Sequence, residues 1–431
     1  MNREDFPILQ SDLIYFDNGA TTLKPSCVID AIVDYYKNYT ANTHRGDYKN
    51  SLLVDENIDR TRKAVQRFIH AKSEREIIFT ENATDSLIQI IFGFFKYKLK
   101  KGDHVVLTKS EHASNVLPWF ELEEEIGIKI DYIPLDEHLH VTLDRLKEVI
   151  TKDTKVISIA EVTNVIGEVT MENVIKSITD KTKVISIAHI SNVIGDVRPI
   201  KEIINYAHKK GILVVVDGAQ SAPHKKTDVQ ELDADFFVFS LHKMCGPTGV
   251  GILYGKLELL NEMKPLKYGG GMNVSFTSDG SKVYQSVPTL FEAGTIQIAG
   301  IIASRFAIEY LEKIGMDQIH DYEMKLKEYA LKRLQEVPGI QIYNPDTDSA
   351  IISFNIDGIF AQDLAVYLDH YHICVRAGSH CAKILIDEIG IKNTCRMSLY
   401  FYNTKEEIDR MVEVLKNPNI LEESLDFISV N

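Results

Sequence analysis

The sequence predicts an α/β protein with a mainly parallel, doubly wound sheet, followed by a smaller α+β domain. Short apolar runs alternate with amphipathic helical patterns up to about residue 294. Several runs are apolar throughout, as expected for parallel strands that helices cover on both faces. After Gly294 the pattern changes to a long amphipathic stretch followed by short strands and helices. A doubly wound sheet binds ligands at the carboxyl ends of its strands, so the candidate site should lie there.

The strands of the first domain are predicted from eight runs rich in β-branched and apolar residues: 76–80, 104–108, 129–133, 155–160, 183–188, 212–216, 236–240 and 250–254. Helical periodicity covers two intervals between them, 84–95 and 200–210. The second domain begins with one long helical stretch, 298–334. It continues with three short strands, 350–356, 373–375 and 395–399, and two helices, 361–369 and 404–415. These patterns divide the chain into an N-terminal segment, a large domain and a small domain: 1–20, 21–297 and 298–431.

Composition excludes several classes of function. The chain of 431 residues carries a formal net charge of −14, which argues against binding to a nucleic-acid backbone. Five cysteines are too few for a disulfide scaffold and favour reduced thiols. No apolar run approaches the ~18 residues of a membrane helix, and the N-terminal stretch MNREDFPILQ lacks the apolar core of a signal peptide. We expect a cytoplasmic enzyme with no nucleic-acid or membrane partner and no metal site.

The sequence contains a tandem duplication. Residues 141–168 and 169–196 align without a gap and share 15 of 28 positions. Two copies are too few for a solenoid. The simpler interpretation is a tolerated insertion that adds a surface helix, with or without a further strand. The alternative is that the two copies compete for a single place in the sheet.

Asp217 and Lys243 stand at the ends of two predicted strands, and together they indicate a pyridoxal cofactor. Asp217 precedes Gly218, and Lys243 lies near Ser240 and next to His242. A lysine held near an apolar strand end can have a lowered pKa, which Schiff-base chemistry requires. Pyridoxal enzymes pair such a lysine with an acid for the pyridinium nitrogen. Taken singly, each residue is as well explained as a helix cap or a surface charge.

His112 and Cys381 are two further candidates. His112 follows the predicted strand 104–108 and so shares the strand edge with Asp217 and Lys243. Cys381 follows Arg376 and His380, and neighbouring positive charge favours a thiolate. The alternative for each is structural, as a satisfied core histidine or a buried cysteine. That alternative is the preferred interpretation of the other four cysteines, Cys27, Cys245, Cys374 and Cys395.

Taken together, these motifs resemble the group II (SUF-type) cysteine desulfurases of the class V aminotransferase superfamily. The resemblance spans nearly the whole chain and rests on these segments: 15–22 (YFDNGATT), 42–46 (NTHRG), 111–119, 191–195, 216–220 (VDGAQ), 240–243 (SLHK), 269–272 (GGGM), 291–295 (FEAGT), 376–381 and 396–407. It implies the fold type I of pyridoxal 5′-phosphate transferases. It also implies the conversion of L-cysteine to L-alanine, with the sulfur passed as a persulfide to an acceptor protein of the SUF system for iron–sulfur cluster assembly.

The resemblance implies roles at the cofactor. Lys243 would bind the cofactor aldehyde and move the Cα proton. Asp217 would keep the pyridinium nitrogen protonated, and His112 would stack on the ring and act as acid or base. Gln220 would bond the phenolic oxygen. The phosphate ligands would be the backbone of Ala83 and the side chains of Thr84, Ser240 and His242.

The resemblance also implies roles at the substrate and between subunits. Arg396 would bind the substrate carboxylate, with Asn192 assisting there or at the cofactor oxygen. Arg376 and His44 would line the substrate entrance, and Cys381 would attack the substrate sulfur and hold the persulfide. Thr295 would reach the phosphate of the neighbouring subunit, which implies a homodimer. The short interval between Arg376 and Cys381 favours group II.

The chain departs from the family pattern at Gly19, Ala83 and Ser379 and at the duplication. Residues 189–192 of the second copy match the family motif better than residues 161–164 of the first. We therefore predict that the second copy occupies the sheet and that the first copy is the extra unit.

Three alternatives stay open on the sequence alone. The chemistry could be that of a selenocysteine lyase. It could also be that of another class V lyase, aminotransferase or epimerase. In a different class, the chain could be a catalytically impaired scaffold homologue, disrupted by the duplication.

Overall fold

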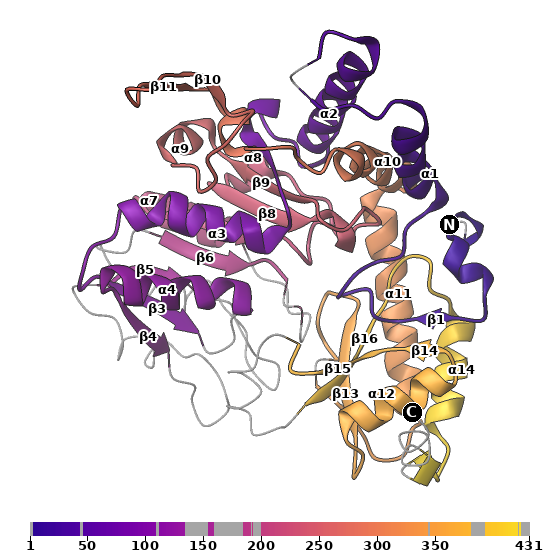
Figure 1. The fold of residues 1–431 in the computed structure, drawn as a ribbon. Coiled ribbons are helices and arrows are strands. Elements are labelled where there is room, and N and C mark those ends of the chain that lie inside the picture. Colours follow the sequence, from indigo (N-terminus) through magenta and orange to yellow (C-terminus); the bar gives the residue numbers. More distant parts are fainter. Residues whose placement is uncertain are drawn as a thin grey trace.

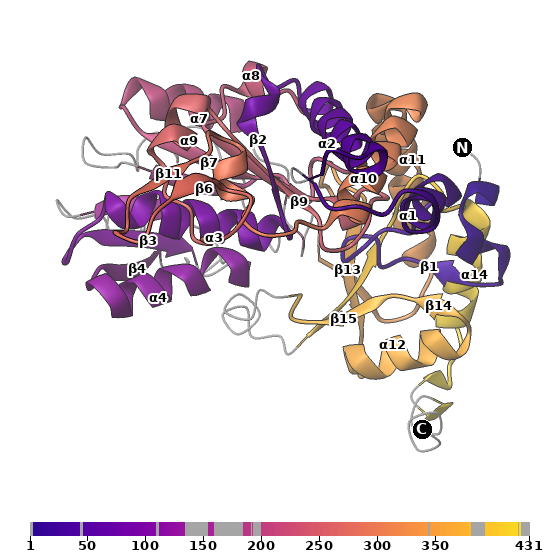
Figure 2. The same cartoon turned by 45° about the horizontal axis from the view of Figure 1, so that its top comes forward.

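The computed structural model describes residues 3–43, 46–108, 112–133, 154–158, 184–190, 192, 200–343, 345–380, 393–420 and 422–423. Two sheets organise this part of the chain, and they lie side by side in Figures 1 and 2. The larger sheet carries most of the predicted site residues. Among the described residues, the search for a helix long and apolar enough to cross a membrane found none.

The larger sheet has eight strands in the order β2–β9–β8–β7–β6–β5–β3–β4. Their bounds are β2 Ile77–Thr80, β3 His104–Thr108, β4 Lys129–Ile133, β5 Thr154–Ser158, β6 Val184–Ala188, β7 Leu213–Asp217, β8 Phe236–Ser240 and β9 Gly251–Gly255. Neighbouring strands are parallel except β9, which is antiparallel to both β2 and β8. The predicted α/β fold is confirmed, and each of the eight predicted runs forms a strand of this sheet.

Helices cover both faces of the larger sheet because its strands are apolar on both sides. Along β8, Phe237 and Phe239 enter one core, while Phe236 and Val238 enter the other. The first core also contains residues of α2 (Lys49–Phe68), α7 (Ile200–Lys209), α8 (Val229–Leu232) and α10 (Ile298–Ile314). The second contains residues of α3 (Ala83–Gly93), α4 (Leu117–Ile126) and α9 (Leu257–Glu262). Figure 2 shows α3 and α4 together on their face.

The strands of the two repeat copies lie next to each other in the sheet. β5 belongs to the first copy and β6 to the second, and they pair in parallel from Val156 with Val184 to Ser158 with Ser186. The prediction that one copy would occupy the sheet was therefore incomplete, because both do. A parallel strand has hydrogen-bonding groups along both edges, so an extra strand can be inserted and the sheet widens by one position. The second copy adjoins β7, the strand that ends in Asp217.

The smaller sheet is antiparallel, in the order β12–β13–β16–β15. Its strands are β12 Ile340–Ile342, β13 Ile351–Ile356, β15 Arg376–Gly378 and β16 Thr394–Ser398. Residues of α11 (Met316–Leu334), α12 (Ala361–His370) and α14 (Lys405–Leu415) complete its core. The predicted helix 298–334 is two helices, α10 and α11. The chain turns between them at Gly315, where φ is +95°, a value that L side chains rarely adopt.

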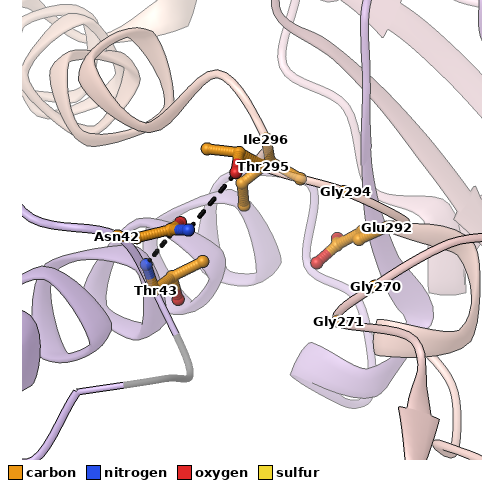
Figure 3. A pocket seen from close by; sticks show the side chains of 8 residues that line it. All are labelled: Asn42, Thr43, Gly270, Gly271, Glu292, Gly294, Thr295 and Ile296. Carbon is orange, nitrogen blue, oxygen red and sulfur yellow. Dashed lines mark hydrogen bonds between the residues drawn. The ribbon is translucent and has the colours of Figure 1, made fainter.

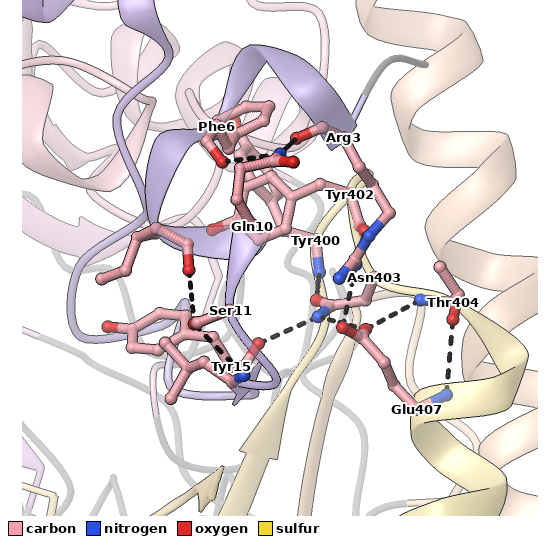
Figure 4. A network of polar contacts seen from close by, with 12 residues as sticks. Arg3, Phe6, Gln10, Ser11, Tyr15, Tyr400, Tyr402, Asn403, Thr404 and Glu407 are labelled. Atoms are coloured by element: carbon pink, nitrogen blue, oxygen red, sulfur yellow. Dashed lines mark hydrogen bonds and ion pairs between the residues drawn. The ribbon is translucent and has the colours of Figure 1, made fainter.

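The N-terminal segment packs on the smaller sheet, which is formed by the C-terminal part of the chain. Strand β1 (Ile14–Tyr15) pairs in parallel with β14 (Ile373–Cys374), and Ile14 and Phe16 enter the core of this part. Figure 4 shows the buried polar network beside it, in which Asn403 donates to the carbonyl of Tyr15 at 2.9 Å and to Glu407 at 3.1 Å. After this network the segment leads to α1 (Ser26–Asn38).

Candidate active site

The candidate site lies at the carboxyl ends of the parallel strands. Asp217 is the last residue of β7 and Ser240 the last of β8. Ala83 begins α3 directly after β2, and His112 follows β3. Because these strands run in the same direction, their ends meet at one edge of the sheet, as the sequence predicted.

Three ionisable groups act on one another at this edge. Burial lowers the pKa of His112, the charge of Lys243 lowers it further, and Asp217 opposes both effects. The imidazole Nδ1 of His112 accepts a hydrogen bond from the backbone N–H of Ser114 at 3.2 Å. The proton of the neutral ring is therefore on Nε2, where it is available to a bound molecule. The backbone of His112 is also held, because the N–H of Asn115 donates to the His112 carbonyl at 2.8 Å and the Asn115 side chain accepts a bond from Ser186 of β6 at 3.2 Å.

The N-terminus of α3 forms the second part of the site. The backbone N–H of Ala83 donates to Ser240 Oγ at 2.8 Å, and Thr84 Oγ1 lies 2.7 Å from Ser114 Oγ. Burial, together with the charges of Lys243 and Lys24, lowers the pKa of His242 to about 4, so this ring is neutral at pH 7. Hydroxyls, a neutral imidazole and a helix N-terminus are groups that bind phosphate.

Gln220 and Gly218 shape the turn after β7. Gln220 is buried and donates from Nε2 to the carbonyl of Gly19 at 2.8 Å, while its Oε1 has no hydrogen-bond partner among the described residues. A Cβ on Gly218 would lie 2.0 Å from the ring of Phe237, so only glycine fits between this turn and β8. Asp217 Oδ1 accepts the backbone N–H of Ala219 at 2.9 Å, which fixes its carboxylate at the strand end.

Arg396 is the buried cation of the site. It lies on β16 with 1% of its surface exposed, and its NH1 donates to the backbone carbonyl of Asn192 at 2.6 Å. NH2 lies 3.1 Å from Asp17 Oδ1, and Arg376 NH1 lies 3.5 Å from Asp17 Oδ2. The structure thus places Arg396 and Arg376 at one carboxylate of the N-terminal segment, that of Asp17, and places Asn192 against Arg396.

Asn192 and His380 connect the two sheets. The side-chain amide of Asn192 donates to the carbonyl of His380 at 2.9 Å, and His380 Nε2 lies 2.7 Å from Thr394 Oγ1. His380 has a φ of +50°, a strained value for a non-glycine residue. Its pKa is lowered to about 3 by burial and by the charges of Arg396 and Arg376, so it is neutral. Two predicted residues, Cys381 and His44, lie outside the described residues.

The residues at this edge fit pyridoxal 5′-phosphate. They supply an amine, a carboxylate, a neutral imidazole and a phosphate-binding helix end, which are the groups that this cofactor requires. The buried Oε1 of Gln220 is an orphaned polar atom of the kind that a ligand completes. The donor set therefore matches the cofactor that the sequence predicted.

Thr295 lines a different pocket, shown in Figure 3. This cavity of about 210 Å³ is bordered by Asn42, Thr43, Gly270, Gly271, Glu292, Gly294, Thr295 and Ile296. Asn42 Nδ2 donates to Thr295 Oγ1 at 3.3 Å, and Thr295 is exposed. The Glu292 carboxylate is held from behind by Arg62, with distances of 2.9 and 2.8 Å. None of the phosphate-side residues above borders this pocket.

Asp17, Thr22 and Ser114 lie within segments that carry the family resemblance, but sequence reasoning assigned none of them a role. Ser114 could have been found, because it follows His112 at the spacing at which a side chain meets a backbone N–H. Asp17 and Thr22 carry no such local signal, since their partners lie more than 200 positions further along the chain.

Comparison with known proteins gives one consistent result. The sequence model of the family described as aminotransferase class-V matches residues 14–171 and 167–411. A probable cysteine desulfurase of Halalkalibacterium halodurans is 41% identical over 416 residues, with 95% of each chain covered. A probable cysteine desulfurase of Staphylococcus aureus is 40% identical over 420 residues, covering 96% of this chain and 95% of the relative.

Solved structures agree with the sequence relatives. The cysteine desulfurase CsdA of Escherichia coli superimposes with a TM-score of 0.82 at 32% identity, covering 98% of this chain and 97% of the other. The cysteine desulfurase of Thermococcus onnurineus NA1 gives a TM-score of 0.83 at 33% identity, with 96% of each chain covered.

Proposed function

We propose a reaction for this chain, which belongs to the aminotransferase class-V family and, by its full-length relatives, is a cysteine desulfurase. It converts L-cysteine to L-alanine and supplies the sulfur for iron–sulfur cluster assembly. The observation that carries the proposal is the convergence of Lys243, Asp217 and His112 at one strand edge, with Arg396 beside Asn192. Pyridoxal 5′-phosphate is the cofactor of this enzyme class, and the donor set fits it.

The residues of the chain divide the chemistry among them. When bound, the cofactor supplies an electron sink for the negative charge that develops on the substrate. Lys243 Nζ holds the cofactor and moves the proton at the substrate Cα. Asp217 holds a proton on the pyridine nitrogen, and Nε2 of His112 donates or accepts a proton close to it. Arg396 orients the substrate through its carboxylate.

Sulfur transfer is assigned to Cys381. Its thiol takes the sulfur of L-cysteine and becomes a persulfide, while the remaining three-carbon amino acid leaves as L-alanine. Arg376, half-buried and beside Asp17, and His44 are proposed at the substrate entrance. The persulfide then passes to an acceptor protein of the SUF system. Reduced cysteines support a cytoplasmic location for this chemistry.

The proposal includes a homodimer in which Thr295 of one subunit serves the phosphate site of the other. Two observations support it. Thr295 is exposed and lines a pocket separate from the phosphate-side residues. Three glycines, Gly270, Gly271 and Gly294, border the same pocket, and none of them has a side chain that would block an approaching phosphate.

The tandem duplication is proposed to have added β5 and left the site intact. The two family matches overlap at residues 167–171, around the junction of the copies at 168 and 169. The strand of the second copy adjoins β7, and Asn192 of that copy contacts Arg396. The first copy contributes the neighbouring strand, one position further from Asp217.

The activity is tested with purified holoprotein and L-cysteine. With a thiol reductant present to reduce the persulfide and release its outer sulfur as sulfide, we expect alanine and sulfide in equal amounts, with faster turnover when a candidate acceptor protein is present. Cys381→Ala should abolish sulfide release while the protein stays yellow, and Lys243→Ala should lose the covalently held cofactor. Cys374→Ala is the matched control, because burial raises the pKa of that thiol and makes it a poor nucleophile.

Each alternative has its own outcome. A colourless protein without turnover would identify a scaffold homologue, and higher activity on selenocysteine a selenocysteine lyase. Unchanged turnover in Cys381→Ala would indicate another class V reaction, in which this cysteine has no part.

A further inference from the structure

The backbone around Lys243 is held in a strained shape. Lys243 ends the short 3-10 helix η6 (Leu241–Lys243), directly after β8. Two residues later, Cys245 adopts a φ of +61°, which is uncommon for a residue other than glycine. Such a conformation is strained and persists only where the surroundings hold it. Residues 242–245 therefore need an external support.

Thr22 supplies that support with a single side-chain oxygen. Its hydroxyl accepts the backbone N–H of Cys245 at 2.7 Å and donates to the backbone carbonyl of His242 at 3.1 Å. Thr22 is 1% exposed, so water does not compete for these bonds. The two bonded groups flank Lys243 on either side, and the hydroxyl closes the turn that carries it.

The carbonyl of His242 is bonded by the same segment at further points. The backbone N–H of Thr22 donates to it at 2.9 Å, Thr21 Oγ1 at 2.9 Å and Lys24 Nζ at 3.1 Å. This carbonyl shares a peptide plane with the nitrogen of Lys243. Fixing the plane fixes the direction in which the Lys243 side chain leaves the backbone.

The supporting segment is itself anchored to the strand that carries Arg396. The backbone N–H of Gly19 donates to Ser398 Oγ at 2.8 Å, and Asn18 Nδ2 donates to the carbonyl of Ser398 at 2.7 Å. The backbone N–H of Leu23 donates to the hydroxyl of Tyr402 at 2.9 Å. Segment 17–24 thus links β16 to the turn of Lys243, beside the network of Figure 4.

We propose that Thr22 is a positioning residue for Lys243. Its hydroxyl holds residues 242–245 so that the Lys243 amine points toward the cofactor site, and the segment of Thr22 ties this turn to the strand of Arg396. The proposal rests on the proposed function for the role of Lys243. This role requires a side chain at position 22 that both donates and accepts a hydrogen bond. Threonine and serine can do so, and valine cannot.

The test compares Thr22→Val with Thr22→Ser and with a matched control elsewhere. Thr61→Val removes another fully buried hydroxyl, which donates to the carbonyl of Asn57 at 3.0 Å within α2. Three quantities are measured for each variant, the first two on the holoprotein and the third on the apoprotein. They are kcat with L-cysteine, the pH at which the bound cofactor's visible band changes, and the rate of covalent capture of pyridoxal 5′-phosphate on Lys243. Hydride reduction and peptide mass analysis report the capture.

We expect Thr22→Val to lower kcat by roughly 10- to 100-fold, because a displacement of about 1 Å at a reacting group costs on the order of 10²-fold. Its spectral titration should shift and its capture should slow, while Thr22→Ser should restore all three quantities. Thr61→Val should leave all three unchanged, even where its apoprotein melts at a lower temperature.

Two results would overturn the proposal: a wild-type titration and capture rate in Thr22→Val, or equal changes in Thr61→Val. If Thr22→Val does not fold, Thr21→Val must shift the titration in the same direction by a smaller amount, and an unchanged profile overturns the proposal. Failure of the proposed function looks different. Wild-type protein would then make no alanine, while capture on Lys243 would still report on Thr22.

Discussion

Two buried arginines, Arg62 on α2 and Arg396 on β16, hold their carboxylates in different ways. Arg62 of α2 meets Glu292 with a parallel pair of bonds, NH1 to Oε1 at 2.9 Å and NH2 to Oε2 at 2.8 Å, and its guanidinium lies over the ring of Phe79. Arg396 reaches Asp17 from NH2 to Oδ1 at 3.1 Å, while its NH1 bonds a backbone carbonyl.

The difference separates a structural cation, Arg62, from Arg396, the cation that we propose binds the substrate. The fork of Arg62 is matched to the full width of one carboxylate, and that carboxylate also accepts the backbone N–H of Phe79. This arrangement is complete without any added molecule. At Arg396 the distance to the carboxylate is longer, 3.1 Å from NH2 to Asp17 Oδ1, and NH1 donates to a backbone carbonyl instead. We propose that a substrate carboxylate takes the place of Asp17 as the partner of Arg396, whereas Arg62 already forms a matched pair of bonds with Glu292.

The largest expected effect is on stability, at Arg62. Arg62→Met leaves Glu292 buried without its cation, which should lower the free energy of unfolding by about 3–5 kcal/mol. Denaturant unfolding of the apoprotein measures it. The double variant Arg62→Met, Glu292→Gln keeps an acceptor for Phe79 and should recover most of the loss. A single variant as stable as the wild type would contradict the structural assignment.

The next effect is on activity, at Arg396. Arg396→Lys keeps the charge but loses the planar pair of N–H groups that a carboxylate requires. We expect kcat/KM for L-cysteine to fall roughly 10- to 100-fold, since a hydrogen bond to a charged group contributes about 1.5–3 kcal/mol. Arg62→Lys is the matched control and should affect the melting temperature more than the kinetics. If Arg62→Lys lowered kcat/KM more than Arg396→Lys did, the roles assigned to the two arginines would be wrong.

A smaller, pH-dependent effect is expected at Lys327, a buried cation of α11 that bonds neutral oxygens. Its Nζ donates to Thr347 Oγ1 at 2.6 Å, and burial lowers its pKa to about 8. The unfolded chain, with the ordinary lysine pKa of 10.5, binds more protons between these values. Stability should therefore rise as the pH increases from about 8 to 10.5.

Lys327→Met should flatten this part of the stability profile, measured by denaturant unfolding at a series of pH values. Lys332→Met, on the exposed side of the same helix, serves as the control and should leave the slope in place. An unchanged slope in Lys327→Met would mean that another group causes the dependence.

The smallest effect is expected at Arg67, five positions after Arg62 on α2. It forms the same kind of fork with Glu312, at 3.0 and 2.6 Å, but more than half of its side chain is exposed. Exposed pairs contribute about 0–1 kcal/mol, so Arg67→Met should barely change denaturant unfolding. A loss equal to that of Arg62→Met would show that geometry, and not burial, sets the stability of these pairs.

Much of the fold could be predicted because strands and helices carry local periodic signals. The predicted strands 104–108, 129–133 and 236–240 coincide with β3, β4 and β8. The division of 298–334 at Gly315 was missed, since the apolar periodicity continues on both sides of one glycine. The sequence revealed the two repeat copies but not that both strands enter the sheet, because pairing is decided by neighbours distant along the chain.

The alternation of strands and helices, and the polar residues that follow the strand ends, could be read from the linear chain, and parallel strands bring their carboxyl ends to one edge. Folding alone decided which groups support them. Asp17 contacts Arg396 across 379 positions, and Thr22 contacts His242 across 220. Such contacts leave no periodicity in the sequence, because they depend on two surfaces that meet only once the core has formed.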